Sequence, residues 1–363
     1  MQDSEKLGLL LNTFFTYEKP EITEFHKAIE QFRDDIPQII KPIKAKISSA
    51  AKTNKKFQSI YQEFVAICKH SIDKNITQND IFEMLLQHIL TEDIFRVVFN
   101  DSDFHVDNNI AKTLNKLEQS FIDKGEKRTL FASIRYYYAA IKSHSLALND
   151  YKEKQKFLNV LYENFYKAYN PKKADKLGIV YTPLEIVDFM INAVDSLTYE
   201  HFDKTLADKN VKILDPATGT GTFLTQIIDY IPINALKQKY TQDLFANEIS
   251  ILPYYIANLN LEYLYQQKMN EYQEFDNISF VDTLELNEST KGQKDLLGLF
   301  SDENMQRVKR QEQAEINIII GNPPYNANQQ NENDNNKNKE YIFIDRQIKE
   351  TYVKSSTAQK TKV

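Results

Sequence analysis

The sequence predicts an α/β domain built on a parallel sheet and preceded by an all-helical domain. Residues 1–170 carry apolar residues at helical spacing throughout, whereas from residue 171 short β-branched runs alternate with helical runs. The chain has 363 residues, 42% of them hydrophobic, which is enough for two cores. We place the boundary at Pro171, because a proline stops the helix before it, and so predict domains at 1–170 and 171–363.

The composition excludes several classes of protein. With 8 Gly, 10 Pro and 12% aromatic residues, the chain is neither collagen-like nor wholly disordered. The single cysteine, Cys68, allows no internal disulfide and no cysteine-only zinc cluster, and indicates a reducing compartment. No apolar run reaches the roughly 18 residues that span a bilayer, and the N-terminal residues lack the pattern of a signal peptide. We therefore expect a cytoplasmic protein with no membrane partner.

Charge is divided unevenly between the two halves. Residues 1–170 carry 24 basic and 23 acidic residues, whereas residues 171–363 carry 21 and 28. An acidic second half is untypical of a non-specific nucleic-acid binder. Two basic stretches, 41–56 and 346–362, run against this trend. Each is interpreted as a contact to DNA phosphates or, as is commoner for such runs, as a solvated lysine-rich face.

The elements of the helical domain follow from caps and apolar spacing. Thr77 and Asp80 have the spacing of a capping box that opens one helix, and a second helix begins at Asn108. Gly125 is placed as the C-terminal cap of that second helix. The scattered histidines form no metal-ligand pattern, so no metal site is predicted. Two further helical runs are expected at about 127–148 and 151–169.

In the second half, four runs are predicted as strands and three as the helices between them. Parallel strands covered by helices place a ligand over the carboxyl ends of the strands. The predicted strands are Val211–Leu214, Leu244–Ala246, Ile278–Val281 and Ile316–Ile320. The predicted helices are Leu184–Leu197, Gly221–Tyr230 and Leu252–Gln266. Because Ile316–Ile320 is mainly apolar, we expect this strand to be buried on both faces of the sheet.

A glycine-containing turn, DPATGTGTFL, directly follows the first predicted strand. Gly219 and Gly221 let the backbone approach a ligand and leave free amides at the start of the next helix. Neither the GxGxxG dinucleotide pattern nor the GK[ST] phosphate-loop pattern is met. Asp215 opens the turn, and an acid there suits a cationic or amine-bearing ligand. Taken alone, however, Gly and Asp also occur in ordinary strand-to-helix turns.

Two further acids follow later strands. Glu248 ends the second strand, where a carboxylate can accept hydrogen bonds from ribose hydroxyls. Asp282 follows the third strand and can accept from the amino group of an adenine ring. Each acid alone is a weak signal, because acids commonly cap strands and helices. Together with the glycine turn, they describe a site for an adenosine that bears no phosphate.

The fourth strand is followed by Asn322-Pro323-Pro324-Tyr325. The two prolines fix the backbone and remove two donors, so the local carbonyls point outward as acceptors. Asn322 supplies a further acceptor and Tyr325 a flat stacking surface. Acceptors beside an aromatic plane are what an exocyclic amino group on a flat ring requires.

Taken together, these segments resemble the N6-adenine DNA methyltransferases. The resemblance rests on GIVYTPLEIVDFMI, DPATGTGTFL, NEI, VDTLEL and INIIIGNPPYN, in the order in which the motif for the methionine end of the cofactor precedes the glycine turn, and it covers about residues 177–363. NENDNNKNKEYIFIDRQIKETYVKSSTAQKTK is similar to the segment after NPPY in Type ISP single-polypeptide restriction–modification enzymes. By position and composition, the helical first half then resembles their coupler.

The resemblance implies a Rossmann-like S-adenosylmethionine-dependent methyltransferase sheet, of which four of seven strands are present. It also implies a role for each motif residue. The methionine end of S-adenosylmethionine would be bound by Tyr181, Thr182 and Pro183, and its amino-acid and sulfonium region by Asp215, Ala217, Gly219 and Gly221. Its ribose would be bound by Glu248, and its adenine by Asp282 and Leu284. The target amino group would bind Asn322 and the Pro323 carbonyl, while Pro324 would fix the turn and Tyr325 would stack on the flipped base.

By the same resemblance, the partners would be double-stranded DNA and the remaining restriction–modification domains or chains. The family places a nuclease and a helicase upstream and a target-recognition domain downstream, so we expect the sequence to be a fragment or split product. We expect the isolated chain to bind the cofactor weakly and not to methylate DNA specifically. Two alternatives stay open: a non-catalytic cofactor-binding or coupling fragment, and a methyltransferase acting on protein glutamine or RNA adenine.

Overall fold

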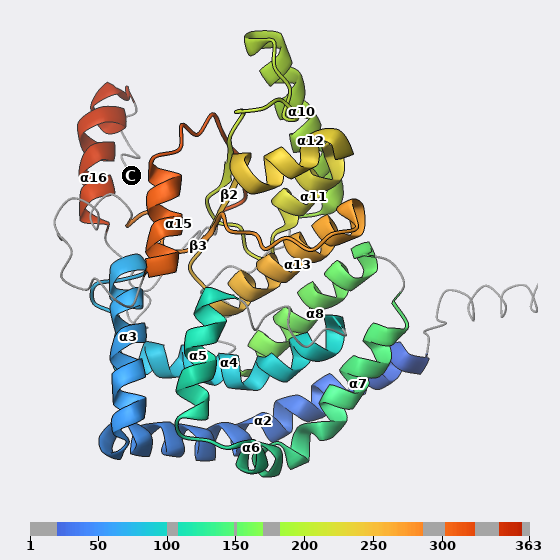
Figure 1. Cartoon of the computed structure of the whole chain (residues 1–363), viewed down its shortest axis with the longest axis vertical. Helices are drawn as coiled ribbons and strands as arrows, with labels where there is room; N and C mark the ends of the chain where they lie inside the picture. Colours follow the sequence, from blue (N-terminus) through green and yellow to red (C-terminus); the bar gives the residue numbers. More distant parts are fainter. Residues whose placement is uncertain are drawn as a thin grey trace, which may run out of the picture.

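The computed structural model describes residues 20–99, 108–148, 151–169, 182–285, 302–323 and 341–357. In these residues the first half is helical and the second half contains a four-stranded parallel sheet (Figure 1). The helices of the first half are α2 (Pro20–Thr53), α3 (Lys55–Ser71), α4 (Gln78–Phe99), α5 (Asn109–Gln119), α6 (Lys124–Leu130), the short 3₁₀ turn η1 (Ala132–Ile134), α7 (Arg135–Leu146) and α8 (Tyr151–Tyr169).

The sheet of the second half has the strand order β3-β2-β1-β4, and every neighbouring pair is parallel. Its strands are β1 (Ile213–Asp215), β2 (Leu244–Glu248), β3 (Ile278–Phe280) and β4 (Ile318–Ile319). The helical elements are α10 (Leu184–Phe202), α11 (Thr222–Tyr230), α12 (Ile233–Gln238), the π turn η2 (Lys239–Asp243), α13 (Ile251–Met269), α15 (Asp302–Glu312), α16 (Ile342–Ile348) and the π turn η4 (Lys349–Val353). The predicted parallel sheet preceded by a helical first half is thus confirmed.

The helix starts predicted in the first half agree with the structure. The Thr77 backbone N–H donates to the Asp80 carboxylate at 3.0 Å, and the Asp80 N–H donates to the Thr77 hydroxyl at 3.3 Å. The Asn108 side chain accepts from the backbone N–H groups of Ile110 and Ala111 at the start of α5. Both caps satisfy helix N–H groups that have no partner within their own helix.

The expected C-terminal cap at Gly125 is wrong. Gly125 lies in the first turn of α6, where its N–H donates to the Asp123 carboxylate at 2.7 Å. Asp123 and Glu126 form a capping box that starts a new helix here. The predicted run at 127–148 is accordingly divided among α6, η1 and α7.

Helix α13 lies between the sheet and the helical first half (Figure 1), and contacts β2 and β3 on one side and α4 and α8 on the other. The buried Tyr254 hydroxyl donates to the Asn109 side chain of α5 at 2.9 Å. The Gln155 amide of α8 donates to the Thr225 hydroxyl of α11 at 2.9 Å. Buried apolar residues of both halves belong to one continuous core.

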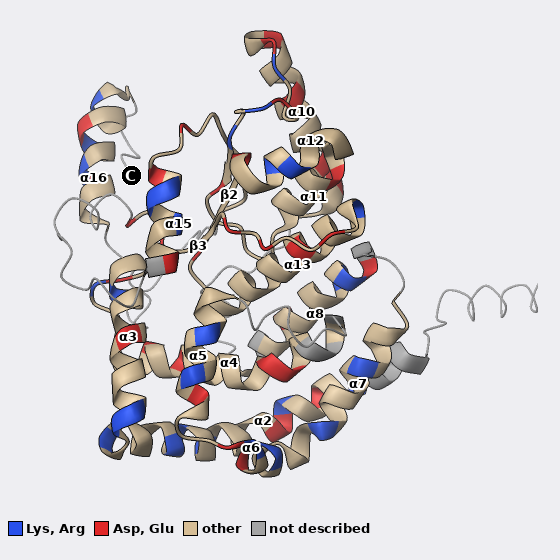
Figure 2. Ribbon diagram, viewed as in Figure 1, with Lys and Arg blue, Asp and Glu red and all other residues tan. Residues whose placement is uncertain are grey.

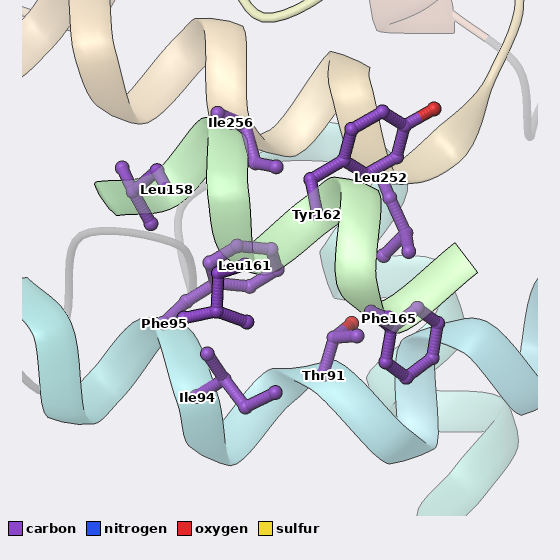
Figure 3. Close-up of a pocket in the computed structure, with 9 residues that line it drawn as sticks. All are labelled: Thr91, Ile94, Phe95, Leu158, Leu161, Tyr162, Phe165, Leu252 and Ile256. Atoms are coloured by element: carbon purple, nitrogen blue, oxygen red, sulfur yellow. The ribbon is translucent and has the colours of Figure 1, made fainter. Parts of the chain in front are cut away.

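A small apolar cavity of about 10 Å³ marks this junction (Figure 3). Its walls come from α4, α8 and α13, and apart from the Thr91 hydroxyl and the Tyr162 phenol they are hydrocarbon. A space of this size holds at most about one water molecule. It is a packing gap between the halves and not a binding site for a nucleoside.

The strand β4 departs from the sequence prediction. Only Ile318 and Ile319 pair with β1, and the Ile319 side chain is 69% exposed, so the expected burial on both faces is wrong. At Asn317 the side chain accepts from the Lys212 N–H, which replaces a ladder bond and shortens the strand. In the described part of the chain, β4 forms the outer strand on the side away from β3.

The basic stretch at 41–56 lies at the end of α2 and the start of α3. Lys44 pairs with Glu83 at 2.5 Å, and Lys46 pairs with Glu126 at 2.9 Å. Figure 2 shows basic and acidic residues interspersed along α2 and α6. The solvated-face interpretation therefore accounts for these two lysines.

Among the described residues, none of the helices has both the length and the apolar character that crossing a membrane would require.

Candidate active site

Four polar residues predicted as site residues follow the four parallel strands. Asp215 ends β1, Glu248 ends β2, Asp282 lies two residues after β3, and Asn322 lies three residues after β4. Because neighbouring parallel strands end at the same edge of a sheet, the fold gathers these residues on one side of the molecule.

Asp215 is fully buried at the centre of this edge. Its Oδ1 accepts from the Ala217 backbone N–H at 3.2 Å, whereas Oδ2 is buried with no hydrogen-bond partner among the described residues. Burial raises the pKa of the Asp215 carboxyl to about 7. A buried acid with an unsatisfied oxygen is suited to a cationic or N–H-bearing ligand.

The glycine turn requires its two glycines for different reasons. Gly219 has φ +57°, and a Cβ there would have no atom within 4 Å, so the turn borders open space. Gly221 has φ +89°, and a Cβ there would lie 3.3 Å from the backbone of Ala257 in α13. The first glycine thus faces a possible ligand, while the second allows α11 and α13 to approach.

Glu248 is tied to the same turn. Its Oε2 accepts from the Gly219 N–H at 2.9 Å, and its Oε1 accepts from the Ser250 N–H at 2.6 Å. Burial is the largest cause that raises the pKa of Glu248 to about 7, and the nearby Asp215 carboxylate adds to it. Glu248 therefore holds the glycine turn in place as well as presenting a carboxylate at the edge of the site.

Asp282 lies in a short turn after β3. Its Oδ1 accepts from the Leu284 N–H at 3.0 Å, and its Oδ2 accepts from the Tyr341 hydroxyl at 3.0 Å. Tyr341 immediately precedes α16, so this contact brings a segment 59 residues away to the site. The Leu284 side chain is 44% exposed and offers an apolar surface beside Asp282.

Asn322 lies close to the segment that precedes α10. Its Nδ2 donates to the Thr182 hydroxyl at 3.0 Å, so the donor end of the amide is used within the protein and the acceptor end is the one that can receive a ligand amino group. Pro183 forms the N-terminal boundary of α10, and Pro183 and Pro323 are both exposed. The remaining predicted site residues, Tyr181, Pro324 and Tyr325, lie outside the described residues.

Gly321 is a site residue that sequence reasoning missed. A Cβ at this position would lie 2.5 Å from Asp215 Oδ1 and 3.3 Å from Pro216 Cδ. Only glycine therefore allows the segment after β4 to pass against the Asp215 turn. The signal was present as a glycine directly before NPPY, but its need became visible only once β4 was placed beside β1.

The fold also brings together three residues that could hold a metal ion, although the sequence shows no such pattern. Within the described residues, His88, Glu92 and Glu118 have ligand atoms within 4.8 Å of one another. The Lys127 ammonium, however, lies 2.7 Å from Glu92 and 2.8 Å from Glu118. Because a cation already bridges the two carboxylates, we interpret this group as a buried ion-pair cluster of the helical half.

Two protein families match this chain. The family described as "Type ISP restriction-modification enzyme, coupler domain" matches residues 28–165, and the family described as "N-6 DNA Methylase" matches residues 153–357. The resemblance on which the sequence prediction rested is therefore confirmed for both halves.

Individual relatives agree with these matches. The Type I restriction enzyme MjaVII methylase subunit of Methanocaldococcus jannaschii is 28% identical over 171 residues, which cover 47% of this chain and 22% of that protein. The DrdV–DNA complex, solved by cryoEM, is 50% identical with a TM-score of 0.83, covering 98% of this chain and 34% of that one. The ATP-dependent Type ISP restriction-modification enzyme LlaBIII bound to DNA is 31% identical with a TM-score of 0.79, covering 91% and 22%. The chain thus spans between about a fifth and a third of the length of these relatives.

Proposed function

Because this chain belongs to the N-6 DNA methylase family, we propose that it transfers a methyl group from S-adenosylmethionine to the exocyclic amino group of a flipped adenine in DNA, within a restriction–modification system. The observation that carries the proposal is the meeting of the buried, half-satisfied Asp215 with Glu248 and Asn322 at adjacent strand ends. Acidic side chains beside an amide acceptor are suited to a cationic nucleoside on one side and an amino group on the other.

The residues present fit S-adenosylmethionine. The unpartnered Asp215 Oδ2 suits its ammonium and sulfonium end, and the open space at Gly219 leaves room for it beside Ala217. Tyr181, Thr182 and Pro183 would hold the methionine end, while Gly221 keeps the turn against α13. When bound, the cofactor supplies an electrophilic methyl group.

For the nucleoside part of the cofactor, we assign Glu248 to the ribose and the Asp282 turn to the adenine. The Glu248 carboxylate lies at the end of β2 next to the glycine turn, where ribose hydroxyls can donate to it. Asp282 would accept the ring amino group, and the exposed Leu284 would pack against the ring face. These assignments follow the strand order: Asp282 after the outer strand β3 is assigned to the adenine, and Glu248 at the end of the next strand, β2, to the ribose.

On the target side, Asn322 and the Pro323 carbonyl would each accept one hydrogen bond from the adenine amino group. The amino lone pair is delocalised into the ring and is poorly nucleophilic. Two fixed acceptors favour the tetrahedral nitrogen that attacks the methyl group, and preorganised groups of this kind are worth about 10²–10³ in rate. Pro324 would fix the turn, and Tyr325 would stack on the flipped base.

In finer detail, we propose that the strand order β3-β2-β1-β4 is one part of a Rossmann-like methyltransferase sheet. The domains would be a coupler-like region at 1–170 and the catalytic region at 171–363. The partners would be double-stranded DNA and the other domains of the restriction–modification system. This agrees with relatives that were solved bound to DNA and are longer than this chain.

The test combines cofactor binding with methyl transfer. Calorimetric titration of the folded chain with S-adenosylmethionine is expected to show saturable binding that Asp215→Ala removes. Transfer of labelled methyl, in an assembly that modifies DNA, is expected at adenine N6. Binding without transfer in every such assembly would favour a non-catalytic coupling fragment, and transfer to protein glutamine or to RNA would favour the other alternative. No binding at millimolar cofactor would overturn the proposal.

A further inference from the structure

The turn that carries Asp282 is held from outside the sheet by α15 and by the end of α3, which belongs to the helical half of the chain. In the described residues β3 is an outer strand, so its far side has no neighbouring strand to pair with its backbone. Unpaired N–H and C=O groups on a buried strand edge are costly and require other partners. Two elements supply them: α15 and the C-terminal end of α3.

Asn304 of α15 occupies the position that a neighbouring strand would have. Its Oδ1 accepts from the Phe280 N–H at 2.9 Å, and its Nδ2 donates to the Phe280 C=O at 3.0 Å. The side-chain amide thus satisfies both backbone groups of Phe280, as a paired strand would. Asn304 is 3% exposed and Phe280 is fully buried, so no solvent competes for these bonds.

Ser71, the last residue of α3, binds the same edge at Asp282, two residues after Phe280. Its backbone C=O accepts from the Asp282 N–H at 2.8 Å, and its hydroxyl accepts from Asn304 Nδ2 at 3.2 Å. The last carbonyls of a helix have no partner within the helix, so the end of α3 is ready to receive an N–H. Between these two bonds, Val281 donates in the opposite direction, to the Glu248 C=O at 3.0 Å.

From this arrangement we infer that Asn304 and Ser71 are positioning residues for the cofactor's adenine ring. They hold the backbone on either side of Val281 in place, and this fixes the direction in which the Asp282 carboxylate points. The carboxylate in turn orients the adenine ring. The inference rests on the proposed role of Asp282. Ser71 lies within the region that matches the coupler domain, whereas Asp282 and Asn304 lie within the region that matches the methylase. The helical half, through Ser71, therefore contributes to how well the site distinguishes the adenine ring.

The test measures discrimination rather than affinity alone. Two probes are titrated against the full 363-residue chain: S-adenosylhomocysteine, and its analogue in which hydrogen replaces the ring 6-amino group. A well-placed carboxylate is expected to favour the amino-bearing probe by about tenfold or more, as for a hydrogen bond to a charged group. General loss of stability weakens both probes together, whereas a misplaced Asp282 weakens only the first.

Asn304→Ala is expected to reduce this discrimination to about twofold, with binding of the analogue nearly unchanged. Ser71→Ala removes only the bond to Asn304 and keeps the backbone bond, so a smaller loss is expected, and it remains informative if Asn304→Ala does not fold. Asn277→Ala is the matched control. Asn277 is also buried and its amide also bridges neighbouring elements, but at the opposite end of β3 from Asp282.

The outcomes separate this inference from the proposed function. If Asp282→Ala leaves discrimination unchanged, the proposed role of Asp282 is wrong. If Asp282→Ala abolishes discrimination while Ser71→Ala and every folded Asn304 variant retain it, the positioning role is wrong. Equal losses in Asn304→Ala and Asn277→Ala would also overturn it, because the effect would then be one of general packing.

Discussion

Asp215→Asn should make the free chain more stable at alkaline pH while removing its affinity for the cofactor. Burial raises the pKa of Asp215 from 3.8 to about 7, so between these pH values the folded chain holds a proton that the unfolded chain has lost. The free energy of unfolding therefore falls as the pH rises from about 4 to about 7, and levels out above. At about 1.4 kcal/mol per pH unit, ionised Asp215 costs the folded state at most about 4 kcal/mol at pH 8.

Asparagine cannot ionise and so avoids this cost. Its amide would, however, be buried where Oδ2 has no described partner, at a cost of about 1–3 kcal/mol. We expect Asp215→Asn to be about 1–3 kcal/mol more stable than the parent at pH 8, and to lose this advantage at pH 5, where the parent carboxyl is protonated. Loss of the Asp215 charge also removes one cause of the raised Glu248 pKa, which acts in the same direction.

Urea unfolding of both chains without cofactor, at pH 5 and pH 8, gives the stability difference, and calorimetry with S-adenosylmethionine at pH 8 gives the affinity. The two readouts should move in opposite directions. A stability difference that does not change with pH would show that Asp215 is not a buried, unpaired carboxyl. Retention of full cofactor affinity by the variant would refute its assignment to the cationic end of the ligand.

The remaining predictions concern the target side of the site and the junction of the halves. Asn322→Ala should lower methyl transfer to DNA adenine by about a hundredfold while leaving cofactor affinity within about a few fold, because we propose that the side chain faces the target base; near-normal rates would contradict this role. Gly321→Ala should weaken cofactor binding by about tenfold in a titration, since its Cβ would lie 2.5 Å from Asp215 Oδ1, whereas Gly125→Ala in exposed α6 should bind normally. A chain restricted to 171–363 should bind a hydrophobic dye, because α13 would lose its cover of α4 and α8; a monomeric, dye-negative product would contradict the shared core.

Sequence patterns predicted which polar residues follow the strands and so lie at one edge of the sheet; their roles in a site stay predictions. Asp215, the glycine turn, Glu248 and Asn322 each follow a short apolar run, and a parallel sheet brings such positions to one edge without further information. The same local rules located the Thr77 cap. They failed at Gly125, because a glycine after an apolar run also fits the first turn of a new helix when Asp123 precedes it.

Residues that act through long-range contacts could not be predicted in this way. Gly321 requires glycine only because β4 lies beside β1, and Asn304 matters only because no strand among the described residues pairs with the outer side of β3. Ile319 was expected to be buried because its run is apolar, yet exposure depends on what covers the strand and not on its composition. Tertiary placement decides all three, and no periodicity in the sequence encodes it.

The packing of the halves bears on how the site works. Helix α13 begins three residues after Glu248, and the Ser250 N–H at its start donates to the Glu248 carboxylate. Leu252 and Ile256 of the same helix pack against α4 and α8 (Figure 3). The helical half is therefore linked to the candidate site in two ways: it packs against α13, which begins beside Glu248, and its Ser71 accepts from the Asp282 backbone N–H. Since a close-packed interior transmits strain, a shift of α3 would act on the proposed adenine contact and a shift of α4 on the proposed ribose contact. Helix α8 lies where the two family matches overlap, at 153–165, and this position accords with a shared core between the region that matches the coupler domain and the region that matches the methylase.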